Sequence, residues 1–507
     1  MLLDARTGQL AYVSRQALTF FVASIPVVAW ALELGVALTA SHLLALFVIG
    51  LAGTVWVVLR RPPLIDLVTI SLIAFVAVAT MSVLRVYSEP DLVILGESIR
   101  AKATKQLIGL WFAFGLFVAL RYLLDTFRLG SHVLRAHFWT TVAIAGLALL
   151  QYGVALWDLR SPLAAFPVHN STLGETRVLD SGVAHYGFPR VSLTLVEPSR
   201  LGTYLLTGWA FWLFAIELGG QGFLRGRRAL FAGILLGAAV ILTGSRSAYA
   251  VFIVVVIVAL LFRPHRLYRL GVVCASIVLA GGLVGPRETA GITASLMPAD
   301  VPAAVREEVS TSRSAAEDQV GVLDSVHAGL VALGTSANPS ARHRIGSVIV
   351  ALAVLREEPW WGAGYGTSEF AMVTKYPNKM GPILTRPLRP TMLGAYNTVL
   401  AETGLLGALC LAGLAIGAFL TVMRVARWGT PRAAAVAWGL GAALGAYALA
   451  MTGLAVETYQ FLLLWLLLSL STTAAVASDA HPAFTARAGT RERTAHPLVT
   501  FALTSDR

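Results

Sequence analysis

Long apolar runs alternate with short polar connections along most of the chain. A transmembrane helix needs about 20 mostly apolar residues, with a tolerated range of roughly 17–25. The sequence therefore predicts an all-α, polytopic integral membrane protein with about twelve transmembrane helices. In chain order, the predicted spans are residues 17–34, 41–59, 64–84, 106–125, 139–157, 201–218, 228–244, 247–263, 268–285, 402–424, 432–453 and 456–476.

The connections between these spans divide the chain into four parts. Nine spans come first, and a large extracytoplasmic loop, expected to be partly helical, separates the ninth span from the tenth. The last three spans follow, and then a polar tail whose composition predicts disorder. The parts are residues 1–285, which include a long outer loop at 158–200, then 286–401, 402–476 and 477–507.

An apolar run that begins at Ile345 stands out within the large loop. It is too short to cross the membrane and too apolar to be a free loop, so it predicts an amphipathic helix at the membrane interface. Gly362, Gly364 and Gly366 follow this run, and they allow tight turns and close approach of the backbone.

Arginine clusters with almost no acids follow the even-numbered spans. Because Lys and Arg collect on the cytoplasmic side of membrane proteins, both termini are predicted to be cytoplasmic and the odd-numbered connections to lie outside. Only 13% of the residues are charged, against roughly 25% in soluble domains. Topology thus accounts for the net charge of +12, and no nucleic-acid partner is expected.

Metal and disulfide chemistry have little support in the sequence. Cys274 and Cys410 both lie inside apolar runs, which leaves no disulfide framework and no CxxC site. The predicted outer connections contain no DxD, no HExxH and no His/Asp cluster with ligand spacing. We therefore expect neither a metal ion nor a cofactor.

Several arginines lie on the predicted outer side, where the charge rule does not explain them. Guanidinium stays ionised and holds phosphate bidentately, so arginines gathered at the outer surface favour a phosphate or diphosphate headgroup whose lipid tail lies among the helices. These residues are Arg190 and Arg200 beside Glu197, Arg246 within TGSRSA (243–248), and Arg344 next to His343.

Each of these residues also has a purely structural interpretation. An arginine at a helix end commonly extends toward lipid phosphate, and a carboxylate such as Glu197 can cap the helix that follows it. Arg190 and Arg344 can form ion pairs with nearby acids, and Asn397 can cap a helical turn. Trp360 and Trp361 are better explained as membrane-interface anchors than as a sugar platform. The acids are Glu175, Asp180, Glu357 and Glu358.

Taken together, four stretches resemble the O-antigen ligase / O-antigen polymerase superfamily of bacterial envelope glycosyltransferases. The resemblance runs from about residue 140 to 455 and includes the helix count and the long outer loop before the tenth span. The stretches are Arg190 to Ser199, LTGSRSA at 242–248, Arg344 to Gly366, and YNTVLAETGLLG at 396–407.

The resemblance implies a function at the outer face of the bacterial cytoplasmic membrane. Such enzymes take a glycan from an undecaprenyl-diphosphate carrier and pass it to a saccharide or glycolipid acceptor, without metal or nucleotide sugar. By position, Arg190, Arg246 and Arg344 resemble the diphosphate-binding arginines, with Arg200 close to the first of them. Whether this member ligates or polymerises stays open.

One departure from the family affects the predicted catalytic residues. The family commonly has His-Asn where this chain has Tyr396-Asn397, and that histidine is the usual candidate base. A tyrosine with a pKa near 10 is a poor base at neutral pH. Either another group takes the proton, or Tyr396 only positions the acceptor, or the chemistry of this member is altered or lost. The candidates for the proton acceptor are Glu197, His343 and Glu402.

Two other classes of function compete with a transferase. A transporter or flippase for a lipid-linked anionic glycan predicts charges in mid-span, broken helices and internal repeats, of which the sequence shows few. A receptor or scaffold leaves the outer arginines unexplained.

Overall fold

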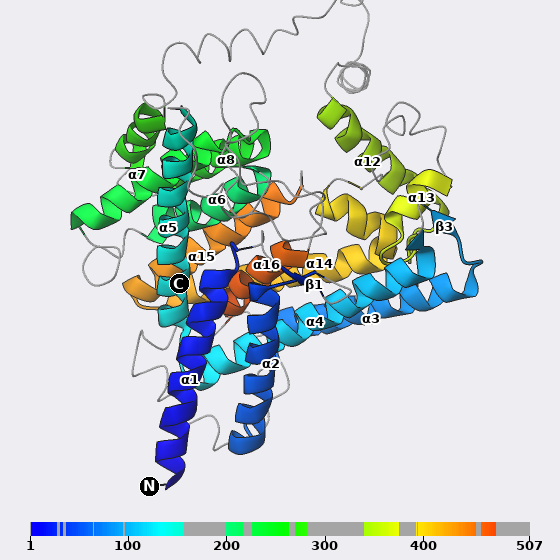
Figure 1. Ribbon diagram of the computed structural model, residues 1–507, viewed down its shortest axis with the longest axis horizontal. Coiled ribbons are helices and arrows are strands. Elements are labelled where there is room, and N and C mark those ends of the chain that lie inside the picture. Colours follow the sequence, from blue (N-terminus) through cyan, green and yellow to red (C-terminus); the bar gives the residue numbers. More distant parts are fainter. Residues whose placement is uncertain are drawn as a thin grey trace, which may run out of the picture.

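The structure is a computed structural model, and most of its described residues are helical (Figure 1). It describes residues 2–27, 31–33, 37–63, 65–94, 97–156, 198–215, 226–262, 269–280, 339–374, 392, 394–452 and 458–472. The helices are α1 (Leu2–Ser24), α2 (Ala40–Leu59), α3 (Leu67–Ser88), α4 (Ile99–Thr126), α5 (Gly130–Leu156), α6 (Pro198–Ala215), α7 (Gly226–Leu242), α8 (Arg246–Phe262), α12 (Pro339–Glu357), α13 (Ser368–Thr374), α14 (Ala395–Trp428), α15 (Pro431–Ala450) and α16 (Thr458–Thr472).

The helical membrane fold is confirmed in its coarse form. A helix overlaps each predicted span, including a short one at 269–280. Six helices in the described part of the chain are long and apolar enough to cross a membrane, namely α2, α3, α4, α5, α14 and α15. The count of twelve spans and the division into domains stay predictions.

The first predicted span, 17–34, is wrong in its second half. Helix α1 ends at Ser24, and strand β1 (Ala31–Glu33) pairs antiparallel with β2 (Ala37–Thr39). Pro26 explains the end of the helix, because the residue before a proline is driven out of the helical conformation. A second hairpin, β3 (Val93–Ile94) with β4 (Glu97–Ser98), joins α3 to α4, so the all-α prediction holds apart from these two hairpins.

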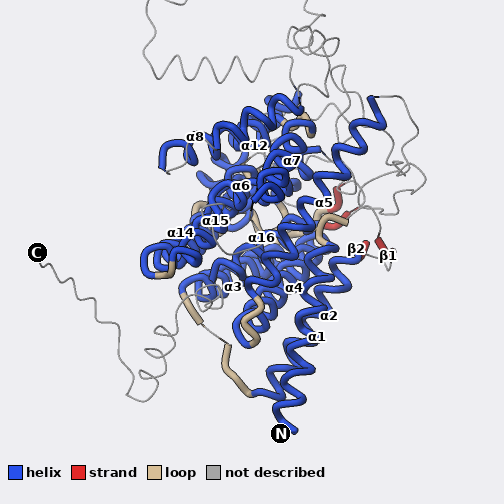
Figure 2. The backbone as a smooth tube through the Cα atoms, turned by 90° about the vertical axis from the view of Figure 1, so that its left-hand side faces the viewer, coloured by secondary structure: helices blue, strands red, loops and turns tan. Residues whose placement is uncertain are grey.

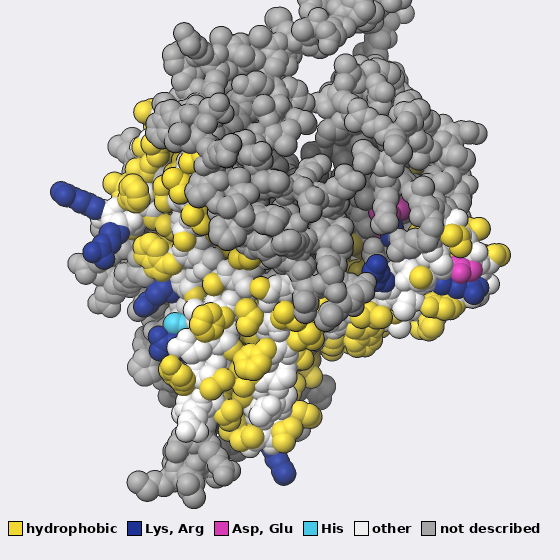
Figure 3. All heavy atoms as spheres, viewed as in Figure 1, with side chains coloured by type: hydrophobic (Ala, Val, Ile, Leu, Met, Phe, Trp, Pro, Cys, Tyr) yellow, Lys and Arg dark blue, Asp and Glu magenta, His cyan; other side chains and the backbone are white. Residues whose placement is uncertain are grey.

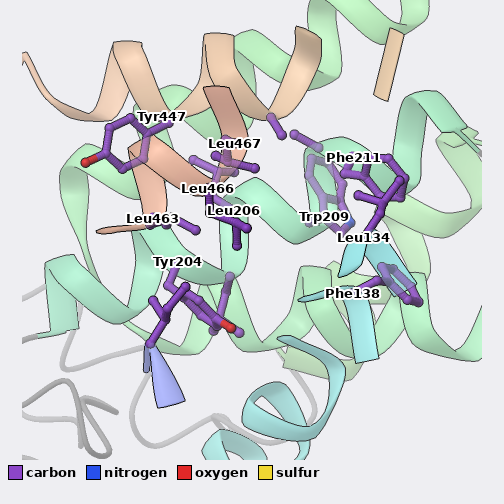
Figure 4. Packing of buried hydrophobic residues seen from close by; sticks show 14 of the residues in the cluster. Leu134, Phe138, Tyr204, Leu206, Trp209, Phe211, Tyr447, Leu463, Leu466 and Leu467 are labelled. Atoms are coloured by element: carbon purple, nitrogen blue, oxygen red, sulfur yellow. The ribbon is translucent and has the colours of Figure 1, made fainter. Parts of the chain in front are cut away.

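Helix α6 occupies the centre of the main hydrophobic core. Every residue from Leu201 to Ala215 is buried, and α5, α7, α8 and α15 pack against this helix (Figure 2). Figure 4 shows buried side chains of α5, α6, α15 and α16 in this core, with Trp209 beside Phe211. The Trp212 indole donates to the carbonyl oxygen of Ala229 in α7 at 2.8 Å, which satisfies its one donor inside the core.

The outer surface of the described helices is largely apolar. Side chains such as Trp56 and Val57 on α2 and Ile108 on α4 are more than half exposed. Figure 3 shows hydrophobic side chains over much of the described surface, with Lys and Arg side chains in separate places at its margins. An apolar surface of this extent belongs in lipid rather than in water, which agrees with an integral membrane protein.

The second half of α14 packs along α3 through small residues. A Cβ added at Gly413 would lie 2.6 Å from the Ser71 hydroxyl oxygen, and one added at Gly417 would lie 2.9 Å from a methyl group of Val68. Close approach of this kind, through glycine, is typical of helix pairs in membranes. Helix α3 therefore serves as a fixed support for α14, which carries part of the candidate site.

Candidate functional site

Two of the predicted arginines lie on adjacent helix ends. Helix α8 begins at Arg246, and the turn before it contains Gly244 with φ +60°. This turn packs against Gly202 of α6, where an added Cβ would lie 2.8 Å from Ala248 Cβ and 3.1 Å from Thr243 Oγ1. Since Arg200 precedes Gly202 by two residues, the first turns of α6 and α8 lie side by side.

The start of α8 is capped from its own sequence. The Ser245 hydroxyl accepts from the backbone N–H of Ala248 at 3.4 Å, as a serine N-cap does. The remaining N–H groups of a first turn, together with the helix dipole, favour an anion. The sequence TGSRSA thus places an arginine at a helix N-terminus next to a second arginine-bearing N-terminus.

The remaining predicted residues fall partly outside the described residues. Arg190 and Glu197 lie outside them altogether. His343 and Arg344 lie near the start of α12, and Arg246 is the first residue of α8, but the side chains of these three also lie outside the described part of the chain. Their roles stay predictions.

Tyr396 and Asn397 lie in the first turn of α14, beside the end of α15. The backbone N–H of Ala395 donates to the Met451 carbonyl oxygen at 2.9 Å. The Tyr396 hydroxyl donates to the Ala448 carbonyl oxygen, also at 2.9 Å. A phenol whose O–H donates a hydrogen bond to a backbone carbonyl is suited to orienting nearby groups rather than to accepting a proton.

Helix α14 is broken at Gly404, which has φ +61° and ψ −155°. This conformation is essentially restricted to glycine, because a side chain there clashes with the backbone. The break leaves four backbone groups of α14 without their helical partners, the carbonyls of Ala401 and Glu402 and the N–H groups of Leu405 and Leu406. In a membrane protein such groups need replacement partners from the protein itself.

The segment between α12 and α13 supplies all four partners. We name residues 358–367 the docking loop. In it, the N–H groups of Ala363 and Gly364 donate to the carbonyls of Ala401 and Glu402 at 2.7 and 3.1 Å. The carbonyls of Pro359 and Trp360 accept from Leu405 and Leu406 at 2.8 and 3.3 Å. The docking loop and the broken helix therefore complete one shared hydrogen-bond pattern, at the right of the view in Figure 1.

The three glycines of the docking loop have the role that the sequence predicts. Gly362, Gly364 and Gly366 all have positive φ, at +65°, +109° and +81°. A Cβ on Gly362 would lie 2.4 Å from the Ala401 carbonyl oxygen, and one on Gly366 would lie 3.1 Å from the Ala103 Cα. Glycine is needed both for the turns and for the close approach to α14 and α4.

A polar cluster lies behind the docking loop, and sequence reasoning missed most of it. The Glu402 carboxylate, 3% exposed, accepts from the Ser368 hydroxyl at 2.7 Å and from the Ser368 N–H at 3.3 Å. Lys102 forms an ion pair with Glu369, next to Ser368. Helix α4 begins at Ile99 rather than near residue 106, and this longer helix brings Lys102 to the cluster.

Tyr365 completes this buried cluster from the docking loop. Its N–H donates to the Ser82 hydroxyl of α3 at 2.9 Å, and its ring lies edge-on to Phe75. Burial, together with the negative charge of Glu402, raises the pKa of Tyr365 above its ordinary value. Tyr365 is therefore a neutral packing and hydrogen-bonding group at physiological pH.

Other sequence interpretations can be placed as well. Glu358, considered above as a partner for an outer arginine, forms an ion pair of 3.0 Å with Arg85 of α3. Trp360 is 57% exposed, which agrees with an interface anchor without testing it. Within the described ranges, no three side chains of His, Cys, Asp or Glu come together as a possible metal site.

Comparison with family models gives a match over part of the chain. Residues 231–412 match the family model described as O-antigen ligase. No curated protein matches the chain. The matched range begins within α7 and ends within α14. Between them it contains α8, α12, the docking loop and α13. Six of the predicted site residues fall inside it, namely Arg246, His343, Arg344, Tyr396, Asn397 and Glu402.

Proposed function

Because the chain carries a domain of the O-antigen ligase / O-antigen polymerase superfamily, we propose that it transfers a glycan from an undecaprenyl-diphosphate carrier to a saccharide or lipid-linked acceptor. The reaction would take place at the outer face of the bacterial cytoplasmic membrane. In this reaction an acceptor hydroxyl oxygen attacks the anomeric carbon of the carrier-linked sugar. The bond from that carbon to the phosphate oxygen breaks, undecaprenyl diphosphate leaves, and a base takes the hydroxyl proton.

The observation that carries the proposal is the pairing of the first turns of α6 and α8, which bear Arg200 and Arg246. A leaving diphosphate gains negative charge in the transition state, and positioned guanidinium groups and helix N-termini stabilise such charge. Arg190 and Arg344 are proposed to complete the diphosphate site. Glu197 and His343 are proposed as alternative proton acceptors.

Tyr396 and Asn397 have a different proposed role. The Tyr396 hydroxyl donates to the Ala448 carbonyl oxygen, which supports a role in positioning rather than in proton transfer. Asn397 lies one residue further along the same first turn of α14 and is proposed to orient the acceptor. An amide side chain suits this role, because it offers both donors and an acceptor to sugar hydroxyls.

A transporter remains the second candidate, because α14 is a broken helix. In transporters with broken helices, the unwound backbone groups bind the substrate or the coupling ion. In this chain each of the four freed groups at Gly404 instead forms a hydrogen bond with the docking loop. This difference favours the transferase.

The test is glycan transfer in detergent from purified undecaprenyl-diphosphate oligosaccharide to a glycan or glycolipid acceptor. We expect Arg246→Ala and Arg190→Ala to lower the transfer rate by about 100- to 1,000-fold, the usual loss when one group that stabilises developing charge is removed. Transfer by the wild type should be insensitive to EDTA.

The control for Arg246→Ala is Arg228→Ala. Arg228 is exposed and lies in the first turn of α7, whereas Arg246 follows the end of that helix. Arg228→Ala should leave the rate unchanged. Equal rates for Arg246→Ala and Arg228→Ala would contradict the diphosphate site. A wild type without any transfer would contradict the proposed activity, and transport assays in vesicles would then be the next measurement.

A further inference from the structure

The buried carboxylate of Glu402 joins two parts of the candidate site. It lies in the N-terminal half-helix of α14, residues 395–403, which also carries Tyr396 and Asn397. Its hydrogen-bond partners, Ser368 and the backbone of Gly366, belong to the chain that follows α12. Helix α12 carries His343 and Arg344. Glu402 therefore connects α14 to the segment that directly follows α12.

Three donors converge on this one side chain. The Ser368 hydroxyl and N–H both reach Oε1, and the backbone of Gly366 provides a further hydrogen bond. A carboxylate has acceptor sites for all of them, whereas the amide of a glutamine would present its own N–H groups to some of the donors. Lys102 nearby supplies a compensating positive charge, as a buried carboxylate needs.

The same geometry argues against Glu402 as the base. The residue is 3% exposed, and its Oε1 already accepts from the Ser368 hydroxyl and N–H. A general base must come within hydrogen-bond reach of the hydroxyl that it deprotonates. The docking loop, through its backbone pairs with Ala401 and Glu402, covers this part of α14.

We propose that Glu402 is a positioning residue for glycan transfer, which holds the half-helix 395–403 against the chain that follows α12 and so sets the distance between the Arg344 and Tyr396 ends of the site. This inference rests on the proposed function. The carboxylate touches neither the carrier nor the acceptor, and its influence passes through Ser368 and the docking loop.

The length of α12 makes the position of Arg344 sensitive to the contact between Glu402 and Ser368. Arg344 lies about 20 Å along α12 from the docking loop, at 1.5 Å of rise per residue. A change of about 3° in the direction of α12 would therefore displace Arg344 by about 1 Å. A displacement of about 1 Å at a reacting centre can lower a rate by about 100-fold.

The test compares Glu402→Gln, Ser368→Ala and the double variant in the transfer assay. Each single variant should lower kcat by about 10- to 100-fold with little change in KM, because the loss lies in alignment and not in substrate binding. The double variant should be no slower than the slower single variant, since both substitutions weaken the same contact between residues 402 and 368. The pH profile of kcat/KM should keep the wild-type shape.

The control is Glu358→Gln, which makes the same chemical change at an exposed position of the docking loop and should leave kcat unchanged. Ser368→Ala keeps the inference testable if Glu402→Gln does not fold, because it removes the hydroxyl hydrogen bond to Glu402, the shorter of the two from Ser368, without altering a buried charge.

Two outcomes would overturn the inference while leaving the proposed function intact. One is loss of the acid limb of the pH profile in Glu402→Gln with normal kcat in Ser368→Ala, which would make Glu402 the base. The other is wild-type kcat in both single variants. A wild type with no transfer at all would remove the proposed function, and this inference with it.

Discussion

Helices α6 and α14 are both held in place by other parts of the protein, but by different means. Helix α6 is continuous and buried from Leu201 to Ala215, so its own backbone bonds are complete and its neighbours contribute side-chain packing. Helix α14 is broken at Gly404 and depends on a loop more than 30 residues earlier in the chain for four backbone bonds. A substitution that disturbs the packing of α6 can be accommodated by movements of side chains. A substitution that displaces the docking loop from the break in α14 removes backbone hydrogen bonds.

The difference has a functional side. The core around α6 places the first turns of α6 and α8, with Arg200 and Arg246, through the contact at Gly202. The break in α14 places Tyr396 and Asn397 relative to α12. The packed core around α6 thus positions one half of the proposed site. The break in α14, with its hydrogen bonds to the docking loop, positions the other half.

The largest effect on stability is expected from Gly404→Ala. Alanine is strained at φ +61° and ψ −155°, and its Cβ would lie 2.5 Å from the Trp360 carbonyl carbon. We expect a loss of about 3 kcal/mol or more in the free energy of unfolding, from backbone strain and overpacking together. Thermal unfolding in detergent and the yield of folded protein measure the loss.

The matched control for this substitution is Gly53→Ala in α2, where an added Cβ has nothing within 4 Å. It should be neutral or stabilising by up to about 1 kcal/mol, because alanine favours a helix. Unfolding temperatures that fall equally in both variants would mean that the break at Gly404 has no special requirement for glycine.

A smaller effect is expected at Gly233 in α7, which tests the packing of α6. A Cβ there would lie 2.3 Å from the ring of Trp212, a fully buried side chain. Overpacking should cost about 1–3 kcal/mol, offset by about 1 kcal/mol from the higher helix propensity of alanine. The net loss in Gly233→Ala, from the same unfolding measurement, should therefore be smaller than in Gly404→Ala; the reverse order would overturn the distinction between the two helices.

The smallest effect is expected from Glu358→Gln. It breaks the ion pair with Arg85, whose side chains are 37% and 48% exposed. Exposed pairs contribute about 0–1 kcal/mol, so the docking loop should stay in place through its backbone bonds. A shift in unfolding temperature as large as that of Gly404→Ala would show that the ion pair, and not the backbone, holds the loop.

Much of the fold could be read from local sequence. Apolar run length predicts a helix at each of the twelve positions, and a helix overlaps each one, because apolar length is a property of a single segment. The error at the end of α1 came from neglecting Pro26, which was also a local signal. The N-terminal extension of α4, with Lys102, went unnoticed because polar residues at a helix end lie outside any apolar window.

Local sequence is enough to predict where the helices lie, the arginine at the start of α8 and the glycine turns of the docking loop, since each depends on residues close together in the chain. The break of α14 at Gly404 and the contact between Glu402 and Ser368 depend instead on residues far apart in the chain. The stretch TGLLG is compatible with a continuous helix when taken alone. The break becomes stable only because a distant loop replaces the hydrogen bonds that the helix gives up, and no local pattern encodes that exchange.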